Sequence, residues 1–126
     1  MQLNMNFTDS NPLKETLASA NFIYLLEFEM PPEDENLSTV YENINSICEY
    51  VKSQQSISSI SLTDRMSSLD SSDPVDLASK VTARSGKEPI IHLSGKGHSK
   101  ESIQERLATI SSNGINNILA LSGDYD

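Results

Sequence analysis

The hydrophobic residues of this chain follow two patterns that alternate along it, one typical of helices and one typical of strands. From Leu37 to Val51 they recur every three or four residues, which places them on one face of a helix over residues 36–52. Over residues 56–63 they alternate with serines, which predicts a strand with one apolar face and one small polar face. The chain therefore contains both kinds of element in succession.

The same patterns predict the other elements. A helix is expected over residues 11–20 with Leu13 and Leu17 as its packing face, and a nearly continuous apolar strand over residues 22–29 suits a parallel sheet. The later elements are a helix that starts at Asp73-Pro74, a strand over residues 89–93, a helix capped by Ser99, and a strand directly after Asn113-Gly114. A regular strand-helix alternation implies right-handed crossovers, so the expected fold class is α/β with a parallel sheet.

Length, net charge and cysteine content limit the classes of protein to which this chain can belong. The 126 residues suit one domain, and we expect a disordered N-terminus over residues 1–10 followed by that domain over residues 11–126. The net charge of −9 argues against a nucleic-acid partner. The single cysteine, Cys48, falls on the apolar helix face and is expected to be a buried structural thiol. No signal peptide or membrane-spanning run is apparent, so we expect a cytoplasmic protein without a membrane partner.

Polar residues gather where the predicted strands end. In parallel α/β proteins ligands bind at the C-terminal strand ends, so these residues should converge on one face: Glu27, Glu29, Thr63, Asp64, His92, Ser94, Ser122 and Asp124. Glu27 and Glu29 are two residues apart and should share a face, either for a function or as a solvated strand end. His92 is either a core histidine with satisfied nitrogens or a ligand contact.

Several other kinds of site are excluded. Residues 94–99 contain two glycines and a lysine without the spacing of a phosphate-binding loop, so a plain loop is the better interpretation. The positions of His92, His98 and Cys48 do not match metal-ligand spacing, and we expect no metal. A serine-hydrolase nucleophile motif is also missing from the sequence.

Four stretches resemble the methylenetetrahydrofolate reductase family, in order and at fitting separations, over about residues 13–124. They are Leu25-Leu-Glu-Phe-Glu-Met-Pro-Pro32, Ser61-Leu-Thr-Asp64, Ile91-His-Leu-Ser94 and Gly114-Ile-Asn-Asn-Ile-Leu-Ala-Leu-Ser-Gly-Asp124. The resemblance implies the first half of a TIM (β/α)8 barrel, with this chain supplying strands one to four. It also implies FAD as cofactor and the reduction of 5,10-methylenetetrahydrofolate to 5-methyltetrahydrofolate.

The resemblance assigns roles to individual residues. It implies that Glu27 is the general acid that helps to open the folate ring, while reduced flavin supplies the hydride. Asp124 would tune the flavin and contact the pterin of the substrate. The residues implied to lie near the cofactor are Thr63, Asp64, His92, Ser122, Gly123 and Asp124. The electron donor would be NAD(P)H or a reduced protein.

The sequence also departs from the family pattern. The family usually has its glutamate three residues before the proline pair, where this chain has Phe28, so either Glu27 or Glu29 can be the match, and the assignment needs a one-residue bulge or shift. Ser122 stands where many members have arginine. Two alternatives to the reductase therefore stay open: a non-catalytic α/β half-barrel module in assembly or regulation, and a divergent paralogue.

Half of a barrel would leave a strand edge unpaired and apolar surface uncovered, so we expect this chain to be inactive alone and to form homo-oligomers or be unstable. Analytical sedimentation and a thermal melt test the expectation. A monomer that melts cooperatively would contradict the view that the chain is the N-terminal part of a longer barrel.

Overall fold

The sheet in this protein is open and entirely parallel. A computed structural model describes residues 10–31, 34–64 and 73–123. The strands lie in the order β1-β2-β3-β4, with bounds Tyr24–Phe28 (β1), Ile57–Leu62 (β2), Glu88–Ser94 (β3) and Ile118–Leu121 (β4). The helices are Pro12–Ala18 (α1), Leu37–Ser53 (α2), Pro74–Ser85 (α3) and Lys100–Ser112 (α4). The predicted α/β class is confirmed, and the arrangement is consistent with half of a (β/α)8 barrel.

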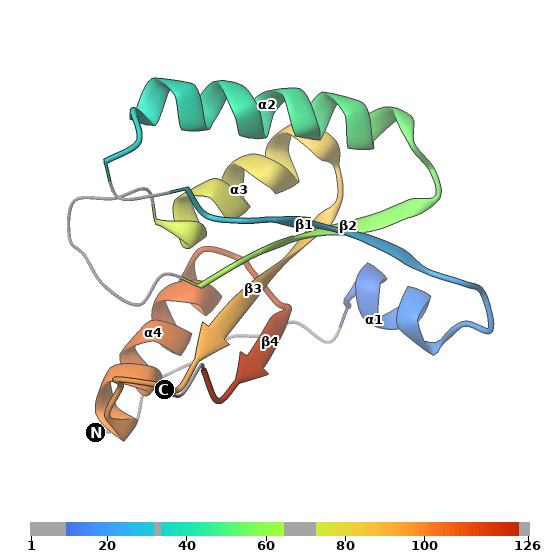
Figure 1. Cartoon of the computed structure of the whole chain (residues 1–126). Helices are drawn as coiled ribbons and strands as arrows, with labels where there is room; N and C mark the ends of the chain where they lie inside the picture. The colour runs from blue at the N-terminus through green and yellow to red at the C-terminus, as the bar shows by residue number, and fades with distance from the viewer. Residues whose placement is uncertain (1–9, 32–33, 65–72, 124–126) are drawn as a thin grey trace.

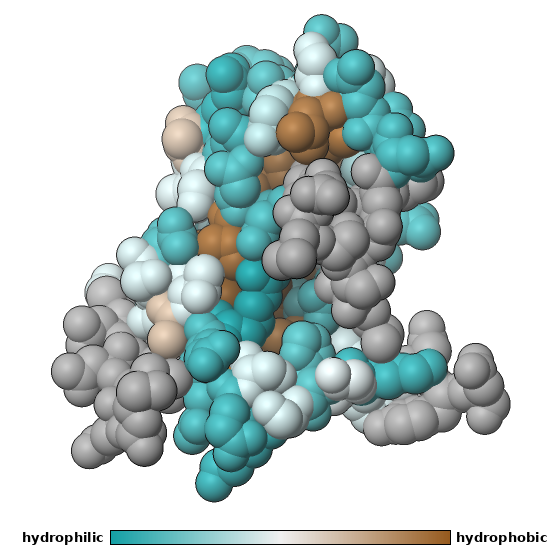
Figure 2. All heavy atoms as spheres, turned by 90° about the vertical axis from the view of Figure 1, so that its left-hand side faces the viewer, coloured by the Kyte–Doolittle hydropathy of each residue, from teal (hydrophilic) through white to brown (hydrophobic). Residues whose placement is uncertain are grey.

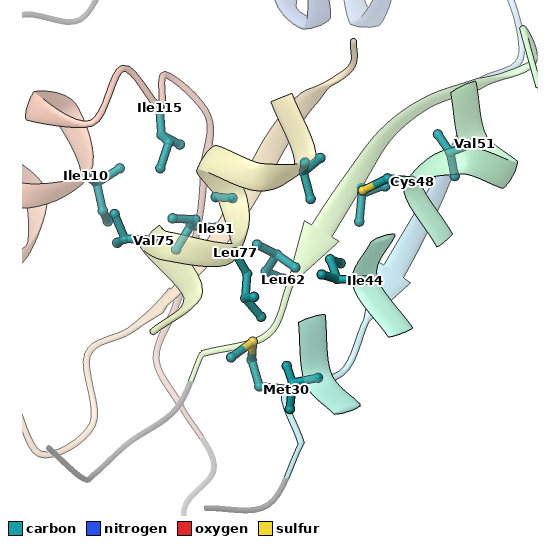
Figure 3. Packing of buried hydrophobic residues seen from close by; sticks show 14 residues of the cluster. Met30, Ile44, Cys48, Val51, Leu62, Val75, Leu77, Ile91, Ile110 and Ile115 are labelled. Carbon is teal, nitrogen blue, oxygen red and sulfur yellow. The ribbon is translucent and has the colours of Figure 1, made fainter. Parts of the chain in front are cut away.

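The hydrophobic core lies between one face of the sheet, here called the outer face, and the helices α2 and α3, and Ile110 of α4 also belongs to it. Helix α1 lies on the other side of the sheet (Figure 1). Ile60 and Leu62 of β2 are fully buried in this core. Figure 3 shows Ile44 and Cys48 of α2 pointing toward Leu62. The alternation of apolar and polar residues in β2 thus turns its apolar side chains toward the helices.

All of the described helices begin at a polar residue that accepts a backbone N–H. These N-caps are Asn11, Asn36, Asp73 and Ser99. Each bond satisfies one of the N–H groups that the first helical turn leaves without a partner. At the other end of α3, Gly86 takes the left-handed conformation with φ of 70°, as its position after Ser85 predicts.

The first elements are shorter than predicted. The helix α1 stops at Ala18, and β1 covers Tyr24–Phe28 instead of residues 22–29. Leu13 is buried as expected, but the prediction that Leu17 packs is wrong, because its side chain is 54% exposed. The reason is that α1 lies on the inner face of the open sheet, where Leu17 borders a cavity.

The last strand starts later than predicted. The chain does not enter β4 directly after Gly114, because residues 115–117 first cross from α4 to the sheet. Ile115 is buried in the core, and the Asn117 carbonyl accepts the Ile91 N–H at 3.1 Å. The predicted disordered N-terminus falls mainly on residues 1–9, which lie outside the described residues.

The buried position of Cys48 is confirmed. Its side chain is fully buried in the core, and burial raises the pKa of the thiol. A thiol with a raised pKa is a poor nucleophile at neutral pH, so Cys48 acts as a small core residue. Within the described ranges, no helix has both the length and the apolar character that crossing a membrane requires.

One surface ion pair connects α4 to the start of α3. Arg106 donates to both carboxylate oxygens of Asp73, at 3.0 and 3.3 Å, while Asp73 also accepts the Val75 N–H. Partial burial would raise the pKa of Asp73, but these hydrogen bonds and the charge of Arg106 outweigh it and hold the pKa below its usual value. A carboxylate stabilised in this way contributes to folding only while it is ionised.

We expect Asp73→Ala to lower the free energy of unfolding by roughly 1–2 kcal/mol, because it removes a helix cap together with the partner of Arg106. Urea denaturation at pH 7 measures the change. Asp73→Asn is the matched control: it keeps a capping oxygen, loses the charge, and should lose less stability.

The pH dependence of the same pair has a defined sign. Because the folded pKa is lowered, the stability difference between the wild type and Asp73→Asn should be present above about pH 4 and shrink as the pH falls through the folded pKa. A difference that stays constant down to pH 2 would show that the charge contributes nothing.

Candidate functional site at the strand ends

Two adjoining cavities lie on the inner side of the sheet. The larger, of about 640 Å³, is bordered by Leu25 and Glu27 of β1, Ser61 of β2, His92 of β3, and the helix α1. The smaller, of about 340 Å³, lies at the C-terminal strand ends. Figure 2 views the molecule from the side on which the strands end, and hydrophobic residues show there in a hollow between hydrophilic ones.

His92 borders both cavities and faces Glu27. The His92 Nε2 and Glu27 Oε2 atoms are 3.8 Å apart, which is ion-pair distance but longer than a hydrogen bond. The His92 side chain is 9% exposed and that of Glu27 is 60% exposed. His92 is thus a buried residue that also borders both cavities, and its contact with a ligand stays a prediction.

The expectation that the two glutamates share a face stays a prediction, because Glu27 lies within β1 whereas Glu29 follows the end of the strand. The strand ends at Phe28, so the alternation of side chains does not extend to Glu29. Glu29 is exposed and borders neither of the two cavities. Glu27 pairs with Ser61 in a register that is regular from Leu25 to Phe28.

Thr63 and Asp64 each accept a hydrogen bond that connects the ends of two neighbouring strands. The Thr63 Oγ1 atom accepts the Met30 N–H at 2.8 Å, which holds the end of β1 against β2. The Asp64 Oδ2 atom accepts the Ser94 N–H at 2.7 Å, which holds the end of β3 against β2. The Thr63 hydroxyl still has a proton that it can donate to a ligand.

The ends of β3 and β4 approach each other closely. The Gly95 N–H donates to the Leu121 carbonyl at 2.8 Å. Gly123 has φ of 93°, and a Cβ atom there would overlap Ser94 Oγ and lie 2.6 Å from Lys96 Cβ. Glycine is therefore required at position 123 both by its backbone angle and by its neighbours.

The structure brings most of the predicted site residues to one place. Those that border the smaller cavity are Thr63, Asp64, His92, Ser94, Ser122 and Gly123. Glu27 borders the larger cavity and lies 3.8 Å from His92, which borders both cavities. Glu29 borders neither cavity. Asp124 lies outside the described residues.

Some cavity residues were not predicted. Asn11, the N-cap of α1, donates through Nδ2 to Asn117 Oδ1 at 2.7 Å. Both residues border the larger cavity, and so does Lys14. The capping role of Asn11 is visible in the sequence, but a partner 106 positions away is not. Among the described residues, no group of His, Cys, Asp or Glu has the arrangement of a metal site.

The sequence matches the profile of a known protein family. The profile of the methylenetetrahydrofolate reductase family matches residues 12–126. The chain belongs to the methylenetetrahydrofolate reductase family. This family is generally flavin-dependent and is an oxidoreductase family. A comparison with curated proteins gave no match.

In this family member, we expect Gly123→Ala to destabilise the protein more than the matched control Gly114→Ala. Both glycines have positive φ, which costs an alanine about 1–2 kcal/mol, but only position 123 adds a steric overlap. Urea denaturation of both variants measures the difference. Equal losses of stability in the two variants would show that residues 94–96 move away from the added methyl group without a cost in free energy.

Proposed function

We propose that this protein serves the flavin-dependent reduction of 5,10-methylenetetrahydrofolate to 5-methyltetrahydrofolate. Membership of the methylenetetrahydrofolate reductase family supports the class of reaction. The observation that carries the proposal for this chain is the position of Glu27, which faces His92 inside one cavity while His92 also borders the next. Through His92, the proposed acid thus adjoins a ligand-sized cavity at the C-terminal ends of the parallel strands, which is where ligands bind in such folds.

Glu27 is the general acid in this proposal. It would donate a proton to N10 of the folate, which opens the five-membered ring and prepares the substrate for reduction. Its position on a paired strand favours it over Glu29, because Glu27 borders the larger cavity and Glu29 borders neither. A general acid must lie within hydrogen-bond reach of the atom that it protonates.

The smaller cavity has the residues to hold part of FAD. Its volume of about 340 Å³ is at the low end of ligand cavities, so it suits a portion of the cofactor. Thr63 and Ser122 provide hydroxyl groups there, and Gly123 leaves the backbone accessible because it has no side chain. When bound, the flavin would supply the two electrons of the reduction.

The remaining roles complete the proposal. Asp124, the neighbour of Gly123, would contact the flavin and the pterin, as the family resemblance implies. NAD(P)H or a reduced protein would reduce the flavin. The expected partners are thus the folate and this electron donor, and we propose a homo-oligomer as the working form.

The test is stopped-flow kinetics on the full-length gene product loaded with FAD. We expect Glu27→Gln to bind flavin and to be reduced normally, but to slow folate-dependent flavin reoxidation by roughly 10²–10⁴-fold, the loss typical of a missing general acid. The two half-reactions are measured separately, so a defect in flavin binding is not mistaken for a defect in protonation.

The matched control is Glu29→Gln, which removes the same charge two residues away and should have much less effect. Equal reoxidation in the wild type and in Glu27→Gln would remove Glu27 from the reaction. A large loss in Glu29→Gln alone would move the acid to that residue. A full-length product that binds no flavin would favour the non-catalytic module.

A further inference from the structure

The Glu27 carboxyl group is poorly held by packing. Its side chain is 60% exposed, and the charged residue on the facing wall of the same cavity, Lys14 of α1, is not its ion-pair partner. A long, exposed carboxylate samples several rotamers, and holding one of them costs conformational entropy. An acid that must meet one substrate atom therefore needs a fixed contact.

His92 is suited to provide that contact. Its neighbours Ile91 and Leu93 are buried, its backbone is paired with β4 at Leu119, and its own side chain is 9% exposed. The backbone of His92 is thus held by the sheet, and its Nε2 atom lies 3.8 Å from Glu27 Oε2. Hydrogen bonds between catalytic groups are often long before the substrate binds and shorten in the substrate complex.

We propose that His92 is a positioning residue for Glu27: it holds the carboxyl group in the rotamer that faces the cavity, in both protonation states. The proposal rests on the proposed role of Glu27 as the acid. A neutral imidazole can donate an N–H to a carboxylate, and its other tautomer can accept the O–H of a carboxylic acid. A general acid passes through both states in each turnover, so a partner of this kind can hold it throughout.

Other charged groups near the pair do not fill this role. Asp64 borders the smaller cavity together with His92, but its carboxylate accepts the Ser94 N–H and so connects the ends of β2 and β3. Lys14 reaches the larger cavity from α1, and an ammonium group can only donate, so it would hold the ionised form alone. An imidazole therefore fits a proton donor better than an ammonium group does.

The functional test is a double-mutant cycle in the full-length gene product. His92→Leu removes both donor and acceptor, and His92→Gln keeps one of each. We expect His92→Leu to slow folate-dependent flavin reoxidation roughly 10- to 100-fold through a lower kcat, with His92→Gln recovering most of the loss. In a Glu27→Gln background, the same His92→Leu change should have little further effect.

Each outcome of the cycle has one meaning. Equal losses from His92→Leu in both backgrounds would overturn the positioning role, because His92 would then act independently of Glu27. A loss in flavin reduction as large as that in reoxidation would overturn it too, because His92 would then act on the cofactor. If Glu27→Gln itself has no effect, the proposed function fails first, and that failure is distinguishable.

A second test needs neither flavin nor turnover. In the cofactor-free protein with ¹⁵N-labelled histidine, Glu27→Gln should shift the ring nitrogen resonances of His92, whereas the matched control Glu29→Gln should leave them in place. His98 serves as an internal reference, because its Nδ1 atom contacts Ser102 Oγ at 3.1 Å, away from β1. Unchanged His92 resonances in Glu27→Gln would overturn the contact on which the proposal depends.

Discussion

The alternation of side chains along parallel strands is the constraint on which the rest of this structure depends. Phe28 and Leu62 turn outward and pack in or against the core beneath the helices, so their neighbours Glu27 and Ser61 must turn inward. A slip of one residue would bury the carboxylate of Glu27 in an apolar core and expose Phe28. Hydrophobic burial on one face of the sheet therefore places the polar residues on the other.

The inner face is built differently from the outer one. Ser61 is small and borders the larger cavity, and the Ser59 hydroxyl donates to the Glu88 carbonyl of the next strand. Leu25, Leu119 and Leu121 remain 43–47% exposed, on the surface that the interior of a closed barrel buries. The core that stabilises these four strands is thus separate from the surface that forms the cavities, and a change in one need not disturb the other.

The sequence predicted the repeating elements well because their causes are local. The helix period around Ile44, the alternation in β2 and the cap at Asp73 each depend on neighbouring residues, and the structure confirms them. Predictions failed where distant contacts decide. Leu17 carries the helix period of a core residue, yet α1 lies against an open face, and nothing in the short α1 segment specifies which face of the sheet it meets.

In the candidate site, too, features that depend on local sequence were predicted and features that depend on distant contacts were not. Placing Thr63, Asp64 and His92 at strand ends needed only the strand order, and these residues do border one cavity. The bonds of Thr63 and Asp64 to backbone groups at the ends of the adjacent strands could not be predicted, because they depend on the stagger between strands. Substitutions of Thr63 or Asp64 would therefore disturb the sheet as well as a ligand, and they are weaker tests of function than substitutions of Glu27.

The register of β1 bears on the proposed acid Glu27, which stands one residue earlier than the glutamate of the family pattern. The position three residues before the proline pair is Phe28, whose side chain packs against the core, where a carboxylate would be strongly destabilising. The pairing of β1 is regular from Leu25 to Phe28, and its one shift lies earlier, between Tyr24 and Leu25, so no bulge separates Glu27 from the strand end. After the strand, Met30 is buried and its N–H donates to Thr63 Oγ1. The proposed acid Glu27 thus lies on the inner face in a regular part of β1, and no bulge is needed to place it there.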